Sequence, residues 1–94
     1  MEMNDPANDA RIRVAYFSQA REYARVNEEN FILKTPASLS DLLNEVIAAH
    51  PGLGSIRDSL HFIVNGVEGN ESVAAKARLT DGDEVAILVP VVGG

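Results

Sequence analysis

The sequence predicts an α+β roll, in which one mixed sheet curls around a single main helix. Three observations support this fold class. The chain has 94 residues, which is enough for one domain with a modest core. Several segments alternate between apolar and polar residues with the period of a strand. Only one long segment carries an apolar stripe with helical spacing, and a sheet is the only partner available to bury it.

The first third of the chain is expected to hold an arm, a strand and a short helix. Residues 1–10 contain Asn, Asp and Pro without periodicity, so we expect a flexible arm before a domain over residues 11–94. The first strand is predicted at residues 11–17. One of its faces would carry Ile12, Val14 and Tyr16, and the other Arg13, Ala15 and Phe17. Ser18 should then cap a short helix. The inner face of that helix would carry Ala20, Tyr23 and Ala24.

The middle of the chain predicts a second strand and the main helix. The strand at residues 30–35 should pair antiparallel with the first, because too few residues join the two for a crossover. The helix is predicted at residues 38–50, and its apolar stripe consists of Leu39, Leu42, Leu43, Val46 and Ile47. Ser38 and Asp41 have the spacing of a capping box. A Pro-Gly pair directly afterwards should end the helix.

The last third of the chain predicts further strands joined by tight turns. A third strand at residues 61–66 ends in an Asn-Gly pair, which favours a hairpin. A short strand is expected near Val67, and a turn or a strand over residues 77–79. Residues 80–84 contain an Asp-Gly pair and should turn the chain. The final strand is predicted at residues 84–91.

This final strand is apolar on both faces, which is unusual for a sheet that a helix covers on one side only. One face would carry Val85, Ile87 and Val89, and the other Ala86, Leu88 and Pro90. An apolar patch on an outer face is typical of a protein interface. The alternative is that another part of this chain covers it.

Composition and charge exclude several classes of function. The formal net charge of −6 argues against nucleic-acid binding, which needs a basic face, but permits docking onto a basic partner. It also fits a surface that simply favours solubility. The absence of cysteine excludes disulfides and thiolate chemistry. The chain shows neither a signal peptide nor a stretch of about 20 apolar residues, so we expect no membrane association and a cytoplasmic location.

No constellation of catalytic or metal-binding residues stands out. His50 and His61 lie apart in the sequence and are expected to be a helix-end and a sheet-surface histidine. Asp58, Ser59 and His61 are too close in sequence to form a catalytic triad. No metal or permanently bound cofactor is expected, and the chain is not expected to be an enzyme on its own.

The sequence closes with Gly93 and Gly94, two residues without side chains. A thin segment of this kind can enter a narrow active site that a bulkier residue would block. A carboxylate becomes an acyl donor once it is coupled to AMP, and the adenylating enzyme must enclose it in a site with little water. We therefore expect Gly94 to be the reactive position, unless the glycines are incidental to an interaction module.

Four stretches of the chain resemble the ubiquitin-like sulfur carriers of the β-grasp fold, most closely the small subunit of molybdopterin synthase. They are VAYFSQAREYA, LSDLLNEVIAAHPGL, VNG and LTDGDEVAILVPVVGG, and they span nearly all of residues 12–94. The resemblance implies that a ubiquitin-activating-like adenylyltransferase uses ATP and magnesium to adenylate Gly94. A sulfur donor protein would then convert the adenylate to a thiocarboxylate. The large synthase subunit would pass this sulfur to a pterin precursor, forming molybdopterin.

The resemblance also implies which residues meet the large subunit. By position, Phe17 and Leu88 match apolar contact residues of the family, and Arg21 matches the arginine of its VRE-like stretch. The tail residues that would reach the partner's active site before the glycines are Val89, Pro90, Val91 and Val92. Two departures are visible. Val89 replaces the first of two prolines common in the family, and the segment at 65–77 is longer than in the familiar bacterial form.

Two alternatives share the same activation chemistry. Archaeal relatives with the same tail are joined through their C-terminal glycine to lysines of other proteins, which would make this chain a protein modifier. Other carriers of this type supply sulfur for thiamin, cysteine or thiolated tRNA. The sequence leaves the final acceptor open.

Overall fold

The structure is a computed structural model that describes residues 9–70 and 77–90. The first elements in the chain are β1 (Asp9–Tyr16), α1 (Ser18–Ala24) and β2 (Glu28–Lys34). The middle of the chain forms β3 (Ala37–Ser38), α2 (Leu39–Ala49) and the 3₁₀ helix η2 (Pro51–Ser59). The remaining strands are β4 (His61–Val64), β5 (Val67–Asn70), β6 (Arg78–Leu79) and β7 (Glu84–Leu88).

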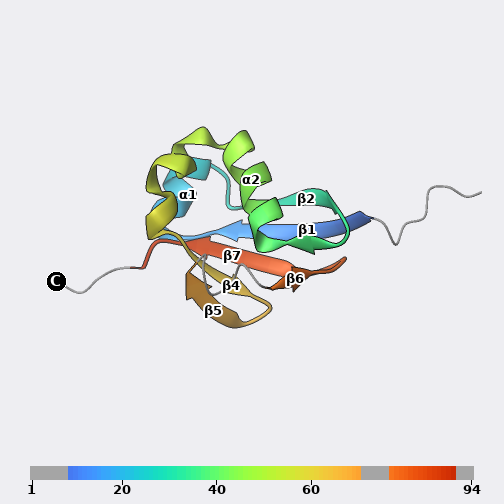
Figure 1. Cartoon of the computed structure of the whole chain (residues 1–94). Helices are drawn as coiled ribbons and strands as arrows, with labels where there is room; N and C mark the ends of the chain where they lie inside the picture. Colours follow the sequence, from blue (N-terminus) through green and yellow to red (C-terminus); the bar gives the residue numbers. More distant parts are fainter. Residues whose placement is uncertain (1–8, 71–76, 91–94) are drawn as a thin grey trace, which may run out of the picture.

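Five strands form one mixed sheet in the order β2-β1-β7-β4-β5 (Figure 1). The central strands β1 and β7 are parallel, and the other neighbouring strands of this sheet run antiparallel. The predicted antiparallel pairing of the first two strands is therefore confirmed. β3 and β6 form a separate two-stranded sheet. The first and last strands of the chain thus meet at the centre of the molecule.

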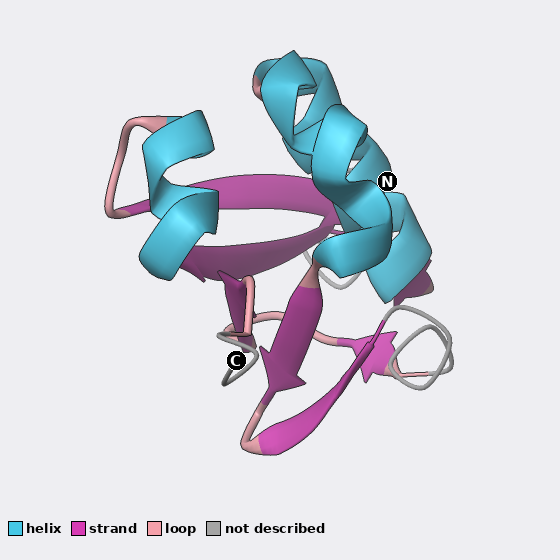
Figure 2. Cartoon of the chain, turned by 90° about the vertical axis from the view of Figure 1, so that its left-hand side faces the viewer, coloured by secondary structure: helices cyan, strands magenta, loops and turns pink. Residues whose placement is uncertain are grey.

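The helices lie together on one side of the main sheet (Figure 2). The predicted stripe of α2 is confirmed, because Leu39, Leu42, Leu43 and Val46 are fully buried and Ile47 is partly buried. Each such leucine contributes about 2 kcal/mol through burial of its apolar surface. Across the sheet the core includes Ile12, Val14 and Ile87. Within the described ranges, no helix has both the length and the apolar character needed to cross a membrane.

Both ends of α2 follow from local chemistry. At its start the Ser38 hydroxyl accepts from the Asp41 amide at 3.2 Å, and the Asp41 carboxylate accepts from the Ser38 amide at 3.0 Å. The predicted capping box is confirmed. At its end the His50 amide donates to the Val46 carbonyl at 2.8 Å, and Pro51 follows. No further helix was predicted at this point, but the chain continues into η2, whose Leu53 is fully buried.

β1 begins two residues earlier than the sequence predicted. Asp9 and Ala10 pair with Lys34 and Leu33 of β2, and Ala10 is fully buried. The Lys34 ammonium also lies 3.0 Å from the Asp9 carboxylate. These two residues therefore belong to the sheet and not to the predicted arm, of which residues 1–8 lie outside the described part of the chain.

Two predictions for α1 are wrong. The N-cap residue is Phe17, not Ser18, and no side chain caps this helix. Ala20 and Ala24 are buried as predicted, but Tyr23 is 38% exposed. Its ring lies against Gly52 of η2, where an added Cβ would come within 2.9 Å of Tyr23 Cδ1. The space between α1 and the sheet accepts alanines, and the larger ring packs on the neighbouring helix instead.

The predicted turns of the second half are confirmed. Asn65 and Gly66 have φ angles of 49° and 89°, which is the conformation of a tight hairpin turn between β4 and β5. Gly82 has a φ of 91° in the turn before β7, where glycine is free of the strain that a side chain would add. The short strand expected near Val67 is β5, and of the turn or strand expected over residues 77–79 the structure has the strand β6.

Candidate functional site

The side of the sheet that faces away from the helices carries an apolar surface over its three central strands. Ala15 of β1 and Ile63 of β4 both lie opposite Ala86 of β7, and His61 lies opposite Leu88. Phe17 comes directly after Tyr16, which pairs with Ile87. It therefore lies on the same side of the sheet as Ala86, near Leu88. We call these six residues the outer face: Ala15, Phe17, His61, Ile63, Ala86 and Leu88.

The outer face is accessible in the described structure. Phe17 is 49% exposed, and Leu88 is half-buried, in contrast to its neighbour Ile87, which is fully buried on the helix side. The predicted alternation of the last strand is therefore confirmed. Large exposed apolar side chains beside a half-buried apolar strand are the expected signature of a docking surface.

A charged cluster lies beside the outer face on β1, β2 and β7. The Arg13 guanidinium lies 2.5 Å from the Glu28 carboxylate and 3.6 Å from that of Glu84. The hydrogen bond that Arg13 donates to Glu28, together with the negative charge of Glu28, raises the pKa of Arg13 above its usual value. One arginine therefore holds two carboxylates at the edge of the apolar surface.

His61 is the polar member of the outer face. Among the described residues, its Nδ1 is the only buried side-chain nitrogen or oxygen without a hydrogen-bond partner. The prediction of a sheet-surface histidine is confirmed, because His61 lies on β4 opposite Leu88. A buried polar atom without a partner costs stability, and a docked protein that supplied one would remove that cost.

β7 leads from the outer face to the C-terminal segment through Val89 and Pro90, both half-buried. The Ser18 hydroxyl lies 3.1 Å from the Val89 carbonyl oxygen and 3.2 Å from its amide nitrogen. We call Ser18, Val89 and Pro90 the C-terminal junction. Ser18 was not among the predicted site residues, because its partner is 71 positions away in the chain.

The structure brings together only some of the predicted site residues. Phe17 and Leu88 share the outer face, and Val89 and Pro90 form the junction. Arg21 is exposed in the last turn of α1 and is not on the strands of the outer face. The other predicted positions, Val91, Val92, Gly93 and Gly94, lie outside the described residues.

On the helix side, Tyr16, Glu29 and His50 join three elements by hydrogen bonds. The Tyr16 hydroxyl donates to Glu29 Oε2 at 2.6 Å, and His50 Nε2 lies 2.5 Å from the same oxygen. Burial, with help from the bond to Glu29, raises the pKa of Tyr16 well above its ordinary value. His50 is the C-cap residue of α2, as predicted. Across residues 9–70 and 77–90, no three or more acidic or histidine side chains are grouped to hold a metal.

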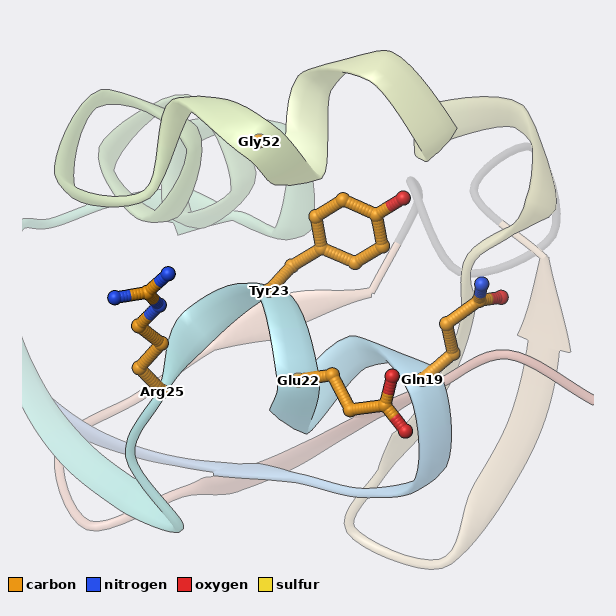
Figure 3. Close-up of a pocket in the computed structure, with 5 residues that line it drawn as sticks. All are labelled: Gln19, Glu22, Tyr23, Arg25 and Gly52. Carbon is orange, nitrogen blue, oxygen red and sulfur yellow. The ribbon is translucent and has the colours of Figure 1, made fainter.

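A second surface feature is an open groove of about 450 Å³ between α1 and η2 (Figure 3). Its lining residues are Gln19, Glu22, Tyr23, Arg25 and Gly52. The Tyr23 ring extends from α1 toward Gly52, and the groove holds no histidine, serine or cysteine. It therefore lacks the residues of a serine or cysteine nucleophile with a histidine base.

Comparisons with known proteins agree with this geometry. The chain is 46% identical over 85 residues to the molybdopterin synthase sulfur carrier subunit of Chlamydomonas reinhardtii, covering 88% of this chain and 98% of that protein. It superposes on SAMP1, a small archaeal modifier protein of Haloferax volcanii, with a TM-score of 0.79 at 25% identity, covering 90% of this chain and 100% of the other.

A second similar solved structure is a complex of subunits 1 and 2 of the molybdopterin-converting factor from Helicobacter pylori. The TM-score is 0.57 at 25% identity, with 89% of this chain and 99% of the matched chain covered. The predicted β-grasp fold is confirmed by these neighbours and by the sheet itself. Residues 14–94 match the ThiS family, and the chain therefore belongs to that family.

Proposed function

We propose that this chain is the sulfur carrier subunit of molybdopterin synthase and carries sulfur as a thiocarboxylate on Gly94. The observation that carries the proposal is that the apolar outer face adjoins the C-terminal junction, which leads toward Gly94. A protein docked on that face would have the end of the chain close to it. The name and 46% identity of the Chlamydomonas relative support this function.

The chemistry would take place at the carboxylate of Gly94 and use groups that other proteins supply. An adenylyltransferase of the ubiquitin-activating type would join this carboxylate to the AMP part of ATP, with magnesium on the phosphates, and release pyrophosphate. A sulfur donor protein would then displace AMP and leave a thiocarboxylate. Because activation consumes ATP, we place these steps in the cytoplasm. The chain would act as the carrier and not as the catalyst, with no permanent cofactor.

Docking to the large synthase subunit would use the outer face. Phe17 and Leu88 would supply apolar contacts, and a hydrogen bond to His61 Nδ1 would satisfy an atom that lacks a partner here. Arg21 would lie at the margin of this contact. The segment that enters the partner's active site would consist of Val89, Pro90, Val91, Val92, Gly93 and Gly94. The two-subunit complex from Helicobacter pylori supports an assembly of this kind.

The test is mass spectrometry of the chain after incubation with its activating enzyme, ATP, magnesium and a sulfur donor. Full-length protein should gain the mass difference of one oxygen replaced by sulfur at Gly94. A variant without Gly94 should keep its fold, because the core lies within residues 10–87, but gain no sulfur. Sulfur on the truncated variant would contradict the proposal.

A second candidate function is that of a protein modifier. The observation that favours it is the likeness to the archaeal modifier SAMP1 over 90% of this chain. Both functions need the same adenylate, and they differ in whether sulfide or a lysine amine attacks it. Protein purified from its own cell separates them. Gly94 linked to lysines of other proteins identifies a modifier, and a free thiocarboxylate identifies a carrier.

A further inference from the structure

One side chain joins the start of α1 to the segment that follows β7. The Ser18 hydroxyl lies 3.1 Å from the carbonyl oxygen and 3.2 Å from the amide nitrogen of Val89. A hydroxyl can donate one hydrogen bond and accept others, so Ser18 donates to the carbonyl and accepts from the amide. Both polar atoms of the Val89 backbone are therefore held by one residue.

The strand ladder does not reach this point. The last backbone hydrogen bond on the β1 side of β7 runs from the Phe17 amide to the Ile87 carbonyl at 2.9 Å. After Phe17 the chain turns into α1, so Val89 no longer has a strand beside it there. Ser18 takes the place of the missing strand and extends the hydrogen bonding to the residue before Pro90.

The contact with Val89 explains the unusual backbone conformation of Ser18, which the formation of α1 does not explain. Ser18 has a φ of 52°, in the left-handed region that costs energy for any residue with a Cβ. Its hydroxyl does not cap α1, whose N-cap is Phe17. The backbone alone would favour glycine at this position. A strained residue whose side chain holds a distant segment points to a function for that contact.

We propose that Ser18 is a positioning residue for sulfur transfer from Gly94, an inference that rests on the proposed function. Because the amide and the carbonyl of Val89 are both held, the backbone of this residue has one orientation. The ring of Pro90 then fixes the φ angle of Pro90 itself. The chain therefore leaves the sheet in a defined direction beside the docked outer face. Fixing this direction in advance reduces the entropy lost when the reacting end is placed in the partner's active site.

Two variants remove the hydroxyl in different ways. Ser18→Ala keeps the backbone strain, whereas Ser18→Gly also relieves it, so a loss of function in both cannot be a consequence of strain. The matched control is Ser55→Ala, which removes a hydroxyl that donates to the Gly52 carbonyl at 2.7 Å, far from Val89 in the chain. Each variant is thiocarboxylated and mixed with the large subunit and the pterin precursor, and single-turnover transfer is measured against carrier concentration.

Both Ser18 variants should transfer sulfur about tenfold more slowly at saturation, since the reacting end is less well aligned. The half-saturating concentration should change little, because the outer face is intact. The Val89 amide should exchange hydrogen faster in Ser18→Gly, whose melting temperature should stay close to that of the unmodified chain. Ser55→Ala should transfer at the normal rate.

Three outcomes would overturn the inference. A normal saturating rate in Ser18→Gly would show that the contact has no part in transfer. A changed half-saturating concentration at a normal saturating rate would place Ser18 in docking instead. If the unmodified chain accepts no sulfur at Gly94, the proposed function fails and this inference fails with it.

Discussion

Tyr16 is a buried residue whose hydroxyl donates a hydrogen bond to one carboxylate. It is 1% exposed, lies edge-on to the His50 ring with the ring centroids 5.6 Å apart, and donates to Glu29. These contacts connect β1, β2 and the end of α2 behind the outer face. Because the buried hydroxyl is held in its neutral form, the proton on Tyr16 contributes to the stability of the folded chain.

This raised pKa gives a pH dependence with a definite sign. The folded state keeps the Tyr16 proton above pH of about 10, where the unfolded state loses it, so stability should fall as pH rises beyond that point. In urea unfolding between neutral and alkaline pH, Tyr16→Phe should lack this decline. At neutral pH it should be less stable by about 1–2 kcal/mol, because the bond to Glu29 is lost.

The control for this prediction is Tyr23→Phe, which leaves Tyr16 and its carboxylate in place. It should keep the alkaline decline of the unmodified chain. A decline of equal steepness in Tyr16→Phe would contradict the assignment, since the effect would then come from other groups.

At the scale of elements, the two faces of β7 lie in different environments. Val85 and Ile87 are buried beneath the helices, whereas Ala86 and Leu88 are partly exposed on the opposite side. If the outer face docks the large subunit, Leu88→Asp should weaken binding by about tenfold or more, because a desolvated carboxylate would oppose an apolar surface. Titration calorimetry measures the affinity, and thermal unfolding shows whether the fold is intact.

The matched substitution on the other face is Ile87→Ala. It should lower the free energy of unfolding by about 2–4 kcal/mol through the cavity that it leaves, and leave the affinity of the folded chain unchanged. A reversed pattern, in which Leu88→Asp lowers the melting temperature without weakening binding, would place Leu88 in the core.

Elements with local signals were predictable from sequence, and those that depend on distant partners were not. The four-residue capping box predicted where α2 begins, and Asn65-Gly66 predicted the hairpin turn. η2 has no apolar stripe to reveal it, only Leu53 buried and Ile56 partly buried. The role of Ser18 depends on Val89, which no local pattern near α1 could indicate.

At the scale of the whole molecule, the net charge of −6 should affect how fast the chain meets its partners. If the large subunit offers a basic surface, opposite charges will steer the encounter. The association rate constant should then fall by about tenfold between low and high salt, while the dissociation rate changes much less. Stopped-flow mixing measures both rates. An association rate that is independent of salt would contradict electrostatic steering.

The parallel pairing of β1 with β7 also decides how the fold responds to force. The chain enters the sheet at the start of β1 and leaves it at the end of β7, and these points lie at opposite ends of neighbouring strands (Figure 1). Tension between them would load the hydrogen bonds of the pair together, in shear, and would not open them one at a time. A partner that pulls on the tail therefore acts on the strand that the sheet holds from both sides.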